Sequence, residues 1–592
     1  MRIKWFSLIR VTGLLLVLLY HFFKHAFPGG FIGVDIFFTF SGYLITALLI
    51  DEYSKSNQID IIGFFRRRFY RIVPPLVLMV LVTIPFTFLV KTDFVANIGS
   101  QIAAALGFTT NFYEILTGSS YESQFIPHLF VHTWSLAIEV HFYIIWGLFV
   151  WFMGRQKYND KQFRGILFVA SSSIFALSFL IMFIRAFFVV NFSLIYFSSI
   201  AHIFPFFIGA MFATISGIKE TTVRFQKNVN LWPRKFVISF VAGAFTLLFL
   251  LTVSLDFNNI ITYLFGFVLA SLFTAVMIYA TRVLNDLTPT IDEPFVITYI
   301  AEISYGLYLF HWPFYIIFSQ LAPNWFAVIL TLIFSVLFST LSYYIIEPLI
   351  VGKKPNLFGL DIPMEGYTKW LALTGLALLL LMVGRSIAAP NVGKFETELT
   401  VGALQQSQNS LNRTHTLAAG DANALGDVSI IGDSVALRSS AAFSKIMPTA
   451  QLDAAVSRNF SQAFDIYDNR KSSETLSKTI VLAVGVNSLG NYKADLQNFI
   501  QDLPKGHRLV IVSPYNSQNL AQVAEVRDYE LSLAKKYSFV SIADWYKVAV
   551  ATPDIWDGTD GVHYSDSTPK GADLYVNTIK DAIEYVAKKD AK

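Results

Sequence analysis

The chain has no cysteine, and only 15% of its 592 residues are charged. The lack of cysteine excludes disulfides, catalysis by a thiolate and metal sites with cysteine ligands. The shortage of charge excludes a wholly soluble protein, because about a quarter of the residues in a soluble domain are charged. The formal net charge of +4 is small, and we expect neither a nucleic-acid partner nor a bound metal.

Hydrophobic residues make up 54% of the chain and are concentrated before residue 390. A membrane span needs about 20 mostly apolar residues. We identify eleven candidate spans: 7–23, 31–50, 72–90, 137–153, 165–189, 193–215, 236–254, 259–280, 302–320, 325–346 and 370–389. The first follows a basic start but lacks a small-x-small cleavage site, so we expect a retained span. The short apolar stretch 98–112 is expected to be re-entrant or interfacial.

The distribution of Lys and Arg predicts the orientation, because cytoplasmic loops are enriched in both. With the N-terminus inside, the inner segments contain twenty such residues: Arg2, Lys4, Lys55, Arg66, Arg67, Arg68, Arg71, Arg155, Lys157, Lys161, Arg164, Lys219, Arg224, Lys227, Arg234, Lys235, Arg282, Lys353, Lys354 and Lys369. The outer loops between spans contain only Lys24 and Lys91. Because eleven is an odd number, the part after the last span is predicted to lie outside the cytoplasm.

Ionisable side chains lie inside or beside the predicted spans, where they are costly and usually functional. They are Arg10, His21, Asp35, Glu139, His141, Arg185, His202, His311 and Glu347. The alternative is that they pack helices together or reach the membrane surface. We favour that alternative for Arg185 and His202, whereas the others lie in recurring motifs.

These motifs are SLIRVTGLLLVLLYHF (7–22), GGFIGVDIFFTFSGYLIT (29–46), FFRRRFYRIVPPL (64–76), HTWSLAIEVHFY (132–143), SYGLYLFHWP (304–313) and IEPL (346–349). Together they resemble the membrane-bound acyltransferase family 3 over residues 1–350. The resemblance implies a polytopic protein that takes an acyl group from cytoplasmic acyl-CoA and passes it outward. It also implies that His21 is essential and that the acyl-CoA site includes Arg10, Asp35, Arg66, Arg67, Arg68, Arg71, Glu139 and His311. His141 departs from the family pattern.

The chemistry of these residues leaves alternatives open. A cluster of arginines at the inner face suits the phosphates of coenzyme A, but a positive inner surface alone would also place them there. His21 could act as a general base or carry the acyl group itself. It lies toward the outer end of its span, so the acyl thioester would have to reach deep into the bundle.

Beyond the last span, residues 390–426 contain Pro390 and many polar residues, and an exposed linker is expected there. Residues 427–592 alternate between strand-like and helix-like segments, which predicts a parallel α/β domain. In such domains catalytic residues lie at the carboxyl ends of strands. Ser434, in VSIIGDSVALRSS (428–440), lies where the first strand turns into a helix. Taken alone, it could simply cap that helix.

Further residues at strand ends make Ser434 a candidate nucleophile. WDGTDGVHYS (556–565) contains Asp560 and His563, so one turn can hold a carboxylate against an imidazole that takes the serine proton. Asp557 is an alternative acid. Asn487, in AVGVNSL (483–489), can donate to an oxyanion. The set resembles the SGNH (GDSL-like) hydrolases, a flavodoxin-like fold. The resemblance implies nucleophile Ser434, base His563, acid Asp560 and, as oxyanion donors, the Ser434 backbone N–H and Asn487, while the backbone N–H of Ser457 could also serve. Ser457 stands where the family usually has glycine.

Four segments are thus predicted: 1–350, the acyltransferase family 3 domain; 351–389, an inner loop and the last span; 390–426, a linker; and 427–592, an extracytoplasmic SGNH domain. The whole plan resembles the OatA-type peptidoglycan O-acetyltransferases. The resemblance implies acetyl-CoA as donor, no bound cofactor, a multi-pass cell-membrane location, and the muramic acid C6 hydroxyl of peptidoglycan as acceptor. The alternatives are another surface glycan, such as teichoic acid or exopolysaccharide, a membrane-anchored esterase, and a transporter with a non-catalytic sensor tail.

Overall fold

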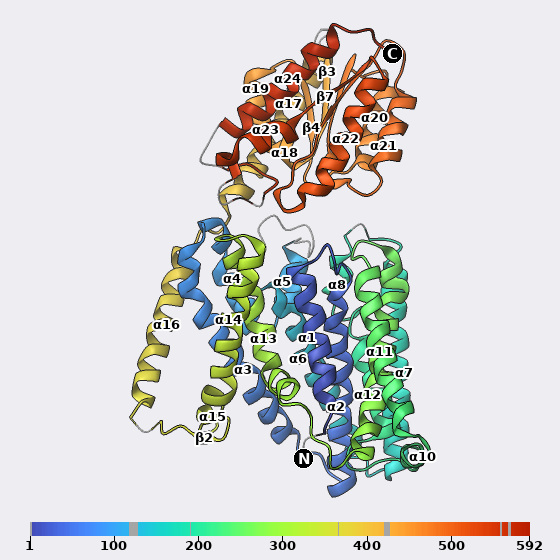
Figure 1. Ribbon diagram of the computed structural model, residues 1–592, viewed down its shortest axis with the longest axis vertical. Coiled ribbons are helices and arrows are strands. Elements are labelled where there is room, and N and C mark those ends of the chain that lie inside the picture. Colours follow the sequence, from blue (N-terminus) through green and yellow to red (C-terminus); the bar gives the residue numbers. More distant parts are fainter. Residues whose placement is uncertain are drawn as a thin grey trace. The chain divides into compact units, whose positions relative to one another are not determined.

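The structure, a computed structural model, describes residues 3–117, 128–189, 191–364, 366–418, 427–556, 559, 561–565 and 570–592. The chain divides into two compact units, Met1–Pro390 and Asn391–Lys592. Each unit has its own core and is described by itself (Figure 1).

The first unit is helical. Its helices are α1 (Phe6–Phe22), α2 (Gly33–Ser56), α3 (Ile61–Phe86), α4 (Ile98–Leu106), α5 (Thr110–Leu116), α6 (Trp134–Gly154), α7 (Asp160–Arg185), α8 (Ser193–Tyr196), α9 (Phe204–Ser216), α10 (Val223–Leu231), α11 (Arg234–Ser254), α12 (Phe267–Leu287), α13 (Phe295–Ser319), α14 (Asn324–Leu341), α15 (Glu347–Ile350) and α16 (Thr368–Ala388). A short hairpin of β1 (Asn356–Leu357) and β2 (Leu360–Asp361) precedes α16.

Within the described residues, eight helices are long and apolar enough to cross a membrane, and α1 and α9 are shorter apolar helices. This confirms a polytopic helical domain, whereas the count of eleven spans stays a prediction. The expected span 193–215 is divided into α8 and α9, because Pro205 favours a new helix start there. The apolar stretch 98–112 forms parts of two helices, α4 and α5, separated at Phe108, which has a φ of 54°.

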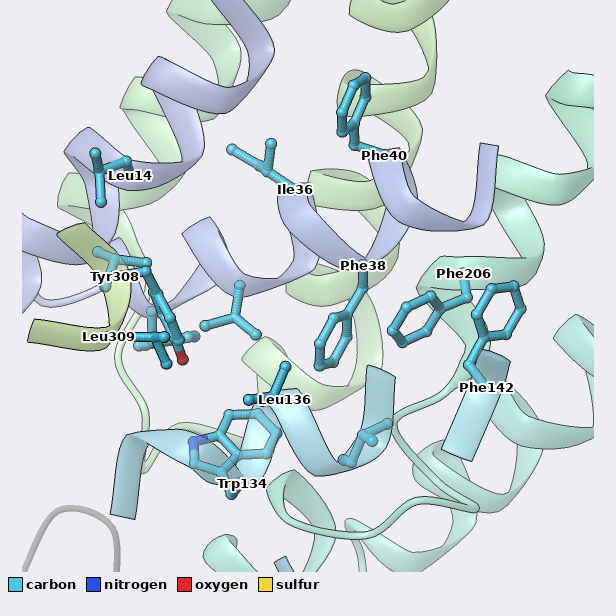
Figure 2. Close-up of a cluster of buried hydrophobic side chains, with 14 of the residues drawn as sticks. Leu14, Ile36, Phe38, Phe40, Trp134, Leu136, Phe142, Phe206, Tyr308 and Leu309 are labelled. Carbon is cyan, nitrogen blue, oxygen red and sulfur yellow. The ribbon is translucent and has the colours of Figure 1, made fainter. Parts of the chain in front are cut away.

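Helices α2 and α9 pack backbone to backbone. A Cβ atom on Gly42 would lie 1.9 Å from the Phe206 carbonyl oxygen, and one on Gly209 would lie 1.9 Å from that of Thr39. Only glycine permits such an approach, which is typical of helix pairs in membranes. Beside this contact, Figure 2 shows Phe206 between Phe38 and Phe142, with ring centroids 4.4 and 4.5 Å apart. These rings join α2, α9 and α6 into one core.

The second unit is an α/β domain. Its elements are α17 (Lys394–Ala418), β3 (Val428–Gly432), α18 (Ser434–Arg438), α19 (Ser440–Ile446), β4 (Gln451–Ala454), α20 (Phe460–Ser472), β5 (Thr479–Ala483), α21 (Tyr492–Asp502), β6 (Arg508–Val512), α22 (Leu520–Lys536), β7 (Val540–Ala543), α23 (Trp545–Ala551) and α24 (Lys570–Ala587). All five strands are parallel, in the order β4-β3-β5-β6-β7. This confirms the predicted parallel sheet, and its assignment to the SGNH fold stays a prediction.

Both faces of this sheet are covered by helices. Alternate strand residues such as Ile431, Leu482 and Ile511 share a core with α20, α21 and α22. Helix α24 packs on β6 and β7, and Figure 1 shows α19 and α24 on the side opposite to α20 and α21. Strands buried on both faces consist of continuous apolar runs, as in VSII and TIVLA.

Three helices of this unit, α17, α20 and α23, were not predicted. Helix α20 begins at a capping box in which Asn459 and Gln462 bond each other's backbone N–H groups. Helix α17 occupies most of the segment expected to be a linker. It belongs to this unit because Leu399 is buried, Glu398 pairs with Arg438 at 3.1 Å, and Gln406 accepts from the Ala454 N–H.

Candidate active sites

The turn after β3 presents Ser434 to His563. The Ser434 Oγ and His563 Nε2 atoms lie 2.8 Å apart, and both side chains are buried. The carboxylate of Asp433 caps α18 by accepting the Val435 N–H at 2.9 Å. Burial raises the pKa of Asp433 to about 6, against the opposing effect of that N–H bond. The serine is therefore held by a capped turn and bonded to a base that can take its proton.

The structure does not describe the predicted acid of this site. Asp560 and its alternative Asp557 lie outside the described residues, and their roles stay predictions. Gly561, which follows Asp560, has a φ of 79°, and its carbonyl oxygen accepts the Ser517 N–H at 2.9 Å. The loop that carries His563 is thus fixed to the segment after β6.

The two predicted oxyanion donors follow the strands that flank β3. Ser457 follows β4 and has a φ of 59°, a left-handed conformation that favours glycine. This explains why the SGNH pattern has glycine here, and serine adopts the same backbone at a cost of about 1 kcal/mol. Asn487 follows β5, and its Nδ2 donates to the Arg458 carbonyl oxygen at 3.2 Å. An amide has two N–H groups, so the second can serve an oxyanion.

Arg458, which the sequence did not single out, connects these parts. Its guanidinium donates to the Gly432 carbonyl oxygen at 3.3 Å and to a carboxylate oxygen of Asp453 at 2.8 Å. Its own carbonyl oxygen accepts the Asn487 amide. One residue therefore bonds the end of β3, the end of β4 and the predicted oxyanion donor Asn487 after β5.

The first unit, Met1–Pro390, is called the membrane unit below. It contains a cavity of about 150 Å³ among α1, α2, α3, α6 and α13. Its lining includes the predicted residues Arg10, Arg68, Arg71 and Glu139, together with Tyr308. Arg71 also pairs with Glu347 at 3.3 Å, and Glu139 accepts from Ser41 at 2.5 Å. The buried Nε of Arg68 has no hydrogen-bond partner among the residues that the structure describes. A buried guanidinium donor without a partner suits an anionic ligand.

Not every predicted residue of the membrane site lines this cavity. Arg66 and Arg67 are exposed, and Arg67 pairs with Glu52 at 3.2 Å. Asp35 lies elsewhere, with its Oδ1 atom 3.0 Å from Nε2 of His202. Both of these side chains are fully buried. His202 thus has a specific partner, which the sequence could not reveal because the two are 167 positions apart.

His21 and His311 meet beyond the cavity. His21 Nδ1 lies 2.8 Å from His311 Nε2, and the two ring planes are nearly parallel, at an interplanar angle of 17°. Tyr308, one turn before His311 on α13, links this pair to the cavity that it lines. A third histidine, His132, has its ring centroid 6.0 Å from that of His311. His132 lies in the motif HTWSLAIEVHFY, but nothing in its local pattern marked it as part of the cluster.

Comparison with known proteins adds to this geometry. A family model described as "Acyltransferase domain" matches residues 3–347. The O-acetyltransferase OatA of Staphylococcus aureus is 26% identical over 609 aligned residues, covering 97% of this chain and 95% of the relative. The protein named "Putative peptidoglycan O-acetyltransferase YrhL" of Bacillus subtilis is 24% identical, covering 97% of each chain.

One solved structure is also similar to part of the chain. It is the C-terminal catalytic domain of the Streptococcus pneumoniae peptidoglycan O-acetyltransferase A, determined with a methylsulfonyl adduct. It is 38% identical, covers 28% of this chain and 97% of its own, and superposes with a TM-score of 0.28.

Proposed function

The chain belongs to the acyltransferase family and is an O-acetyltransferase of the membrane, and we propose that it carries acetyl groups from cytoplasmic acetyl-CoA to the hydroxyls of peptidoglycan. The proposed acceptor is the C6 hydroxyl of muramic acid, and Ser434 carries the acetyl group as a covalent intermediate. The observation that carries the proposal is the 2.8 Å contact between Ser434 Oγ and His563 Nε2 at the end of β3.

The proposed chemistry at Ser434 follows from this contact. His563 takes the Oγ proton as Oγ attacks the acetyl carbonyl carbon. The bond from that carbon to the donor group then breaks, the donor group keeps the bonding electrons, and His563 gives it the proton. Negative charge then develops on the carbonyl oxygen, where the Asn487 amide and the backbone N–H groups of Ser434 and Ser457 can donate to it. His563, neutral again, next removes the proton of the glycan hydroxyl as its oxygen attacks the acetyl-serine. The bond between the acetyl carbon and Oγ breaks, and His563 returns the proton to Oγ of Ser434. Asp560 would hold the imidazole.

The arginine-lined cavity supports acetyl-CoA as the proposed donor. Arg10, Arg68 and Arg71 supply positive charge, and the unpartnered Nε of Arg68 offers a hydrogen bond to a phosphate or a carbonyl oxygen. Lys and Arg are in excess in the loops expected to be cytoplasmic. In this proposal the second unit therefore lies on the other side of the membrane. Peptidoglycan as the acceptor is supported by the name of the YrhL relative.

A hydrolytic role for the same site is the second candidate, because a serine that is bonded to histidine can also pass its acetyl group to water. The test uses the second unit, residues 391–592, purified and supplied with an activated acetyl ester, with and without peptidoglycan fragments. We expect acetyl transfer to the fragments and loss of turnover in Ser434→Ala. Release of acetate that added fragments do not change would favour an esterase instead.

The proposed acceptor is tested separately in cells. Acetate released by base from purified cell walls is compared between cells with and without the gene. We expect the ester to be confined to muramic acid and to disappear without the gene. Ester found on teichoic acid or an exopolysaccharide, with unchanged peptidoglycan, would replace the proposed acceptor.

A further inference from the structure

The histidine pair of the membrane unit has hydrogen-bond partners that fix where its protons lie. His311 Nδ1 lies 2.7 Å from the carbonyl oxygen of Tyr308 and 3.1 Å from that of Leu307. A carbonyl oxygen only accepts hydrogen bonds, so Nδ1 of His311 must carry a proton. Since His311 is fully buried and bonds no carboxylate among the described residues, the neutral ring is favoured. Its Nε2 therefore carries a lone pair.

That lone pair determines the tautomer of His21. The only ring nitrogen of His21 within hydrogen-bond distance of His311 is Nδ1, at 2.8 Å. An N–H must lie between the two nitrogens, and His311 Nε2 has none to give, so Nδ1 of His21 donates. A neutral His21 then carries its own lone pair on Nε2. The backbone carbonyl oxygens of α13 thus determine, through His311, which nitrogen of His21 is reactive.

We propose that His311 is a positioning residue and proton acceptor for His21, and that Nε2 of His21 is the atom that takes the acyl group from an acyl thioester. This rests on the proposed function, and it names the reactive atom and the role of His311. The arrangement parallels a serine site, with a backbone carbonyl, an imidazole and the nucleophile in sequence.

The proposed step balances in protons and charge. Nε2 of His21 attacks the thioester carbonyl carbon, the new C–N bond forms, the C–S bond breaks, and the thiolate leaves. The Nδ1 proton of His21 passes to Nε2 of His311. The products are a neutral acyl-imidazole at His21, an imidazolium at His311 that still donates to Tyr308, and a thiolate. Without His311, the acyl-imidazole would keep its proton and a positive charge, which favours return of the acyl group to the thiolate.

The surroundings of the pair suit a reactive acyl-imidazole. The His21 ring lies against Trp312, with centroids 4.6 Å apart, and against Tyr20 at 5.3 Å. Tyr308, which lines the cavity, has its ring centroid 5.7 Å from that of His311. Its hydroxyl lies 2.6 Å from Ser135 Oγ and donates to the His132 carbonyl oxygen at 2.9 Å. Aromatic walls exclude water, which would otherwise hydrolyse the intermediate.

The test measures exchange between acetyl-CoA and isotopically labelled coenzyme A in membranes that contain the full chain with Ser434→Ala. This background removes the second site and leaves only the acyl-imidazole step. We expect exchange to persist in Ser434→Ala and to vanish when His21→Ala is added. His311→Gln retains an oxygen that can accept from His21 but cannot take a proton. We expect it to lower kcat of exchange by about 100-fold or more, with the KM for acetyl-CoA nearly unchanged.

The matched control is His141→Gln, the same chemical change on α6 outside the pair, where His141 lies 3.2 Å from Ser199. We expect it to leave exchange close to that of the background. Exchange at the full rate in His311→Gln, or a loss that appears only in KM, would overturn the inference. Absence of exchange in the Ser434→Ala background would overturn it as well.

A second measurement determines the tautomer of His21 in the chain without substitutions. In the intact chain labelled with ¹⁵N-histidine, the His21 signals, assigned by their loss in His21→Ala, report which ring nitrogen carries hydrogen. We expect a proton on Nδ1 and none on Nε2, and the reverse tautomer would exclude the proposed arrangement. Glycan acetylation in the same membranes separates the two proposals. Acetylation that needs Ser434 but occurs without exchange would overturn this inference and leave the proposed function intact.

Discussion

Ser434 and His563 are 129 positions apart in the chain, yet their side chains meet at 2.8 Å. Two elements create this contact. Strand β3 ends in a turn that Asp433 caps, and the loop before α24 returns His563 to the same edge of the sheet. In the proposed mechanism this contact activates the Ser434 hydroxyl, and the parallel sheet holds both partners at the carboxyl ends of its strands.

Removing the nucleophile tests this relationship. We expect Ser434→Ala to lower kcat/KM of the isolated second unit on an activated acetyl ester by roughly 10⁴-fold or more. We expect His563→Ala to cause a similar loss, because the two residues act as one unit. Ser461→Ala, an exposed serine on α20, is the control and should retain full activity. Substantial turnover in Ser434→Ala, with normal far-UV circular dichroism, would assign the chemistry to another residue.

Arg458 should matter for rate more than for binding. Arg458→Ala removes the bonds to Gly432 and Asp453 that hold the loop bearing Ser457. We expect kcat to fall by about 10- to 100-fold, since misplacing a group by 1 Å can cost that much. Arg470→Ala is the matched control, because Arg470 binds the other Asp453 oxygen at 2.8 Å. Equal kcat losses in both variants would mean that Arg458 acts only through stability.

Glu530 should reduce stability as the pH rises. It is fully buried on α22, neither carboxyl oxygen has a hydrogen-bond partner in the described part of the chain, and burial raises its pKa well above the ordinary value. The folded unit therefore binds a proton that the unfolded chain releases near pH 4.3. The free energy of unfolding of the second unit must then fall as the pH rises above about 4.3. Below that pH both states bind the proton, and the stability is retained.

Glu530→Met removes this dependence. We expect it to stabilise the second unit at pH 7 by about 1–3 kcal/mol, and by less at pH 4, as measured by urea unfolding. The control Glu584→Met alters a carboxylate that is 59% exposed and should change stability little at either pH. A gain from Glu530→Met that does not grow between pH 4 and pH 7 would show that Glu530 has no raised pKa.

The buried pair Asp35–His202 should stabilise the membrane unit rather than bind the donor. The pair joins α2 to the break before α9, and His202 Nδ1 also bonds the Tyr196 carbonyl oxygen at 2.8 Å. Removing one partner leaves the other buried without its hydrogen-bond partner, which lowers the free energy of unfolding by about 3–5 kcal/mol. We expect Asp35→Leu and His202→Leu each to lower the thermal midpoint in detergent, and the double variant to recover part of the loss. Losses that simply add would show that the two residues are not coupled.

The sequence predicted those parts of the fold that depend on local pattern. The alternation of strand-like and helix-like segments predicted the five strands, and Gly-Asp-Ser with Asp-x-x-His predicted where Ser434 and His563 would meet. Helix α17 was missed because most of its residues are polar. Only a few residues, such as Leu399 and Gln406, contact the rest of the domain, and the sequence pattern does not distinguish them. His202 was expected to pack helices together, but its partner Asp35 was missed, as was Arg458, for a different reason. Their roles come from partners brought together only by the tertiary structure, and no local spacing encodes them.

The central claim is that acetyl from acetyl-CoA passes through the membrane unit to Ser434. The most direct measurement incubates sealed vesicles containing the full chain with ¹⁴C-acetyl-CoA on the cytoplasmic side, quenches rapidly, and locates the label by peptide mass spectrometry. We expect label on the peptide that carries Ser434 in the wild type and none there in His21→Ala. Label on Ser434 in His21→Ala, or its absence in an active wild type, would exclude this route for the acetyl group.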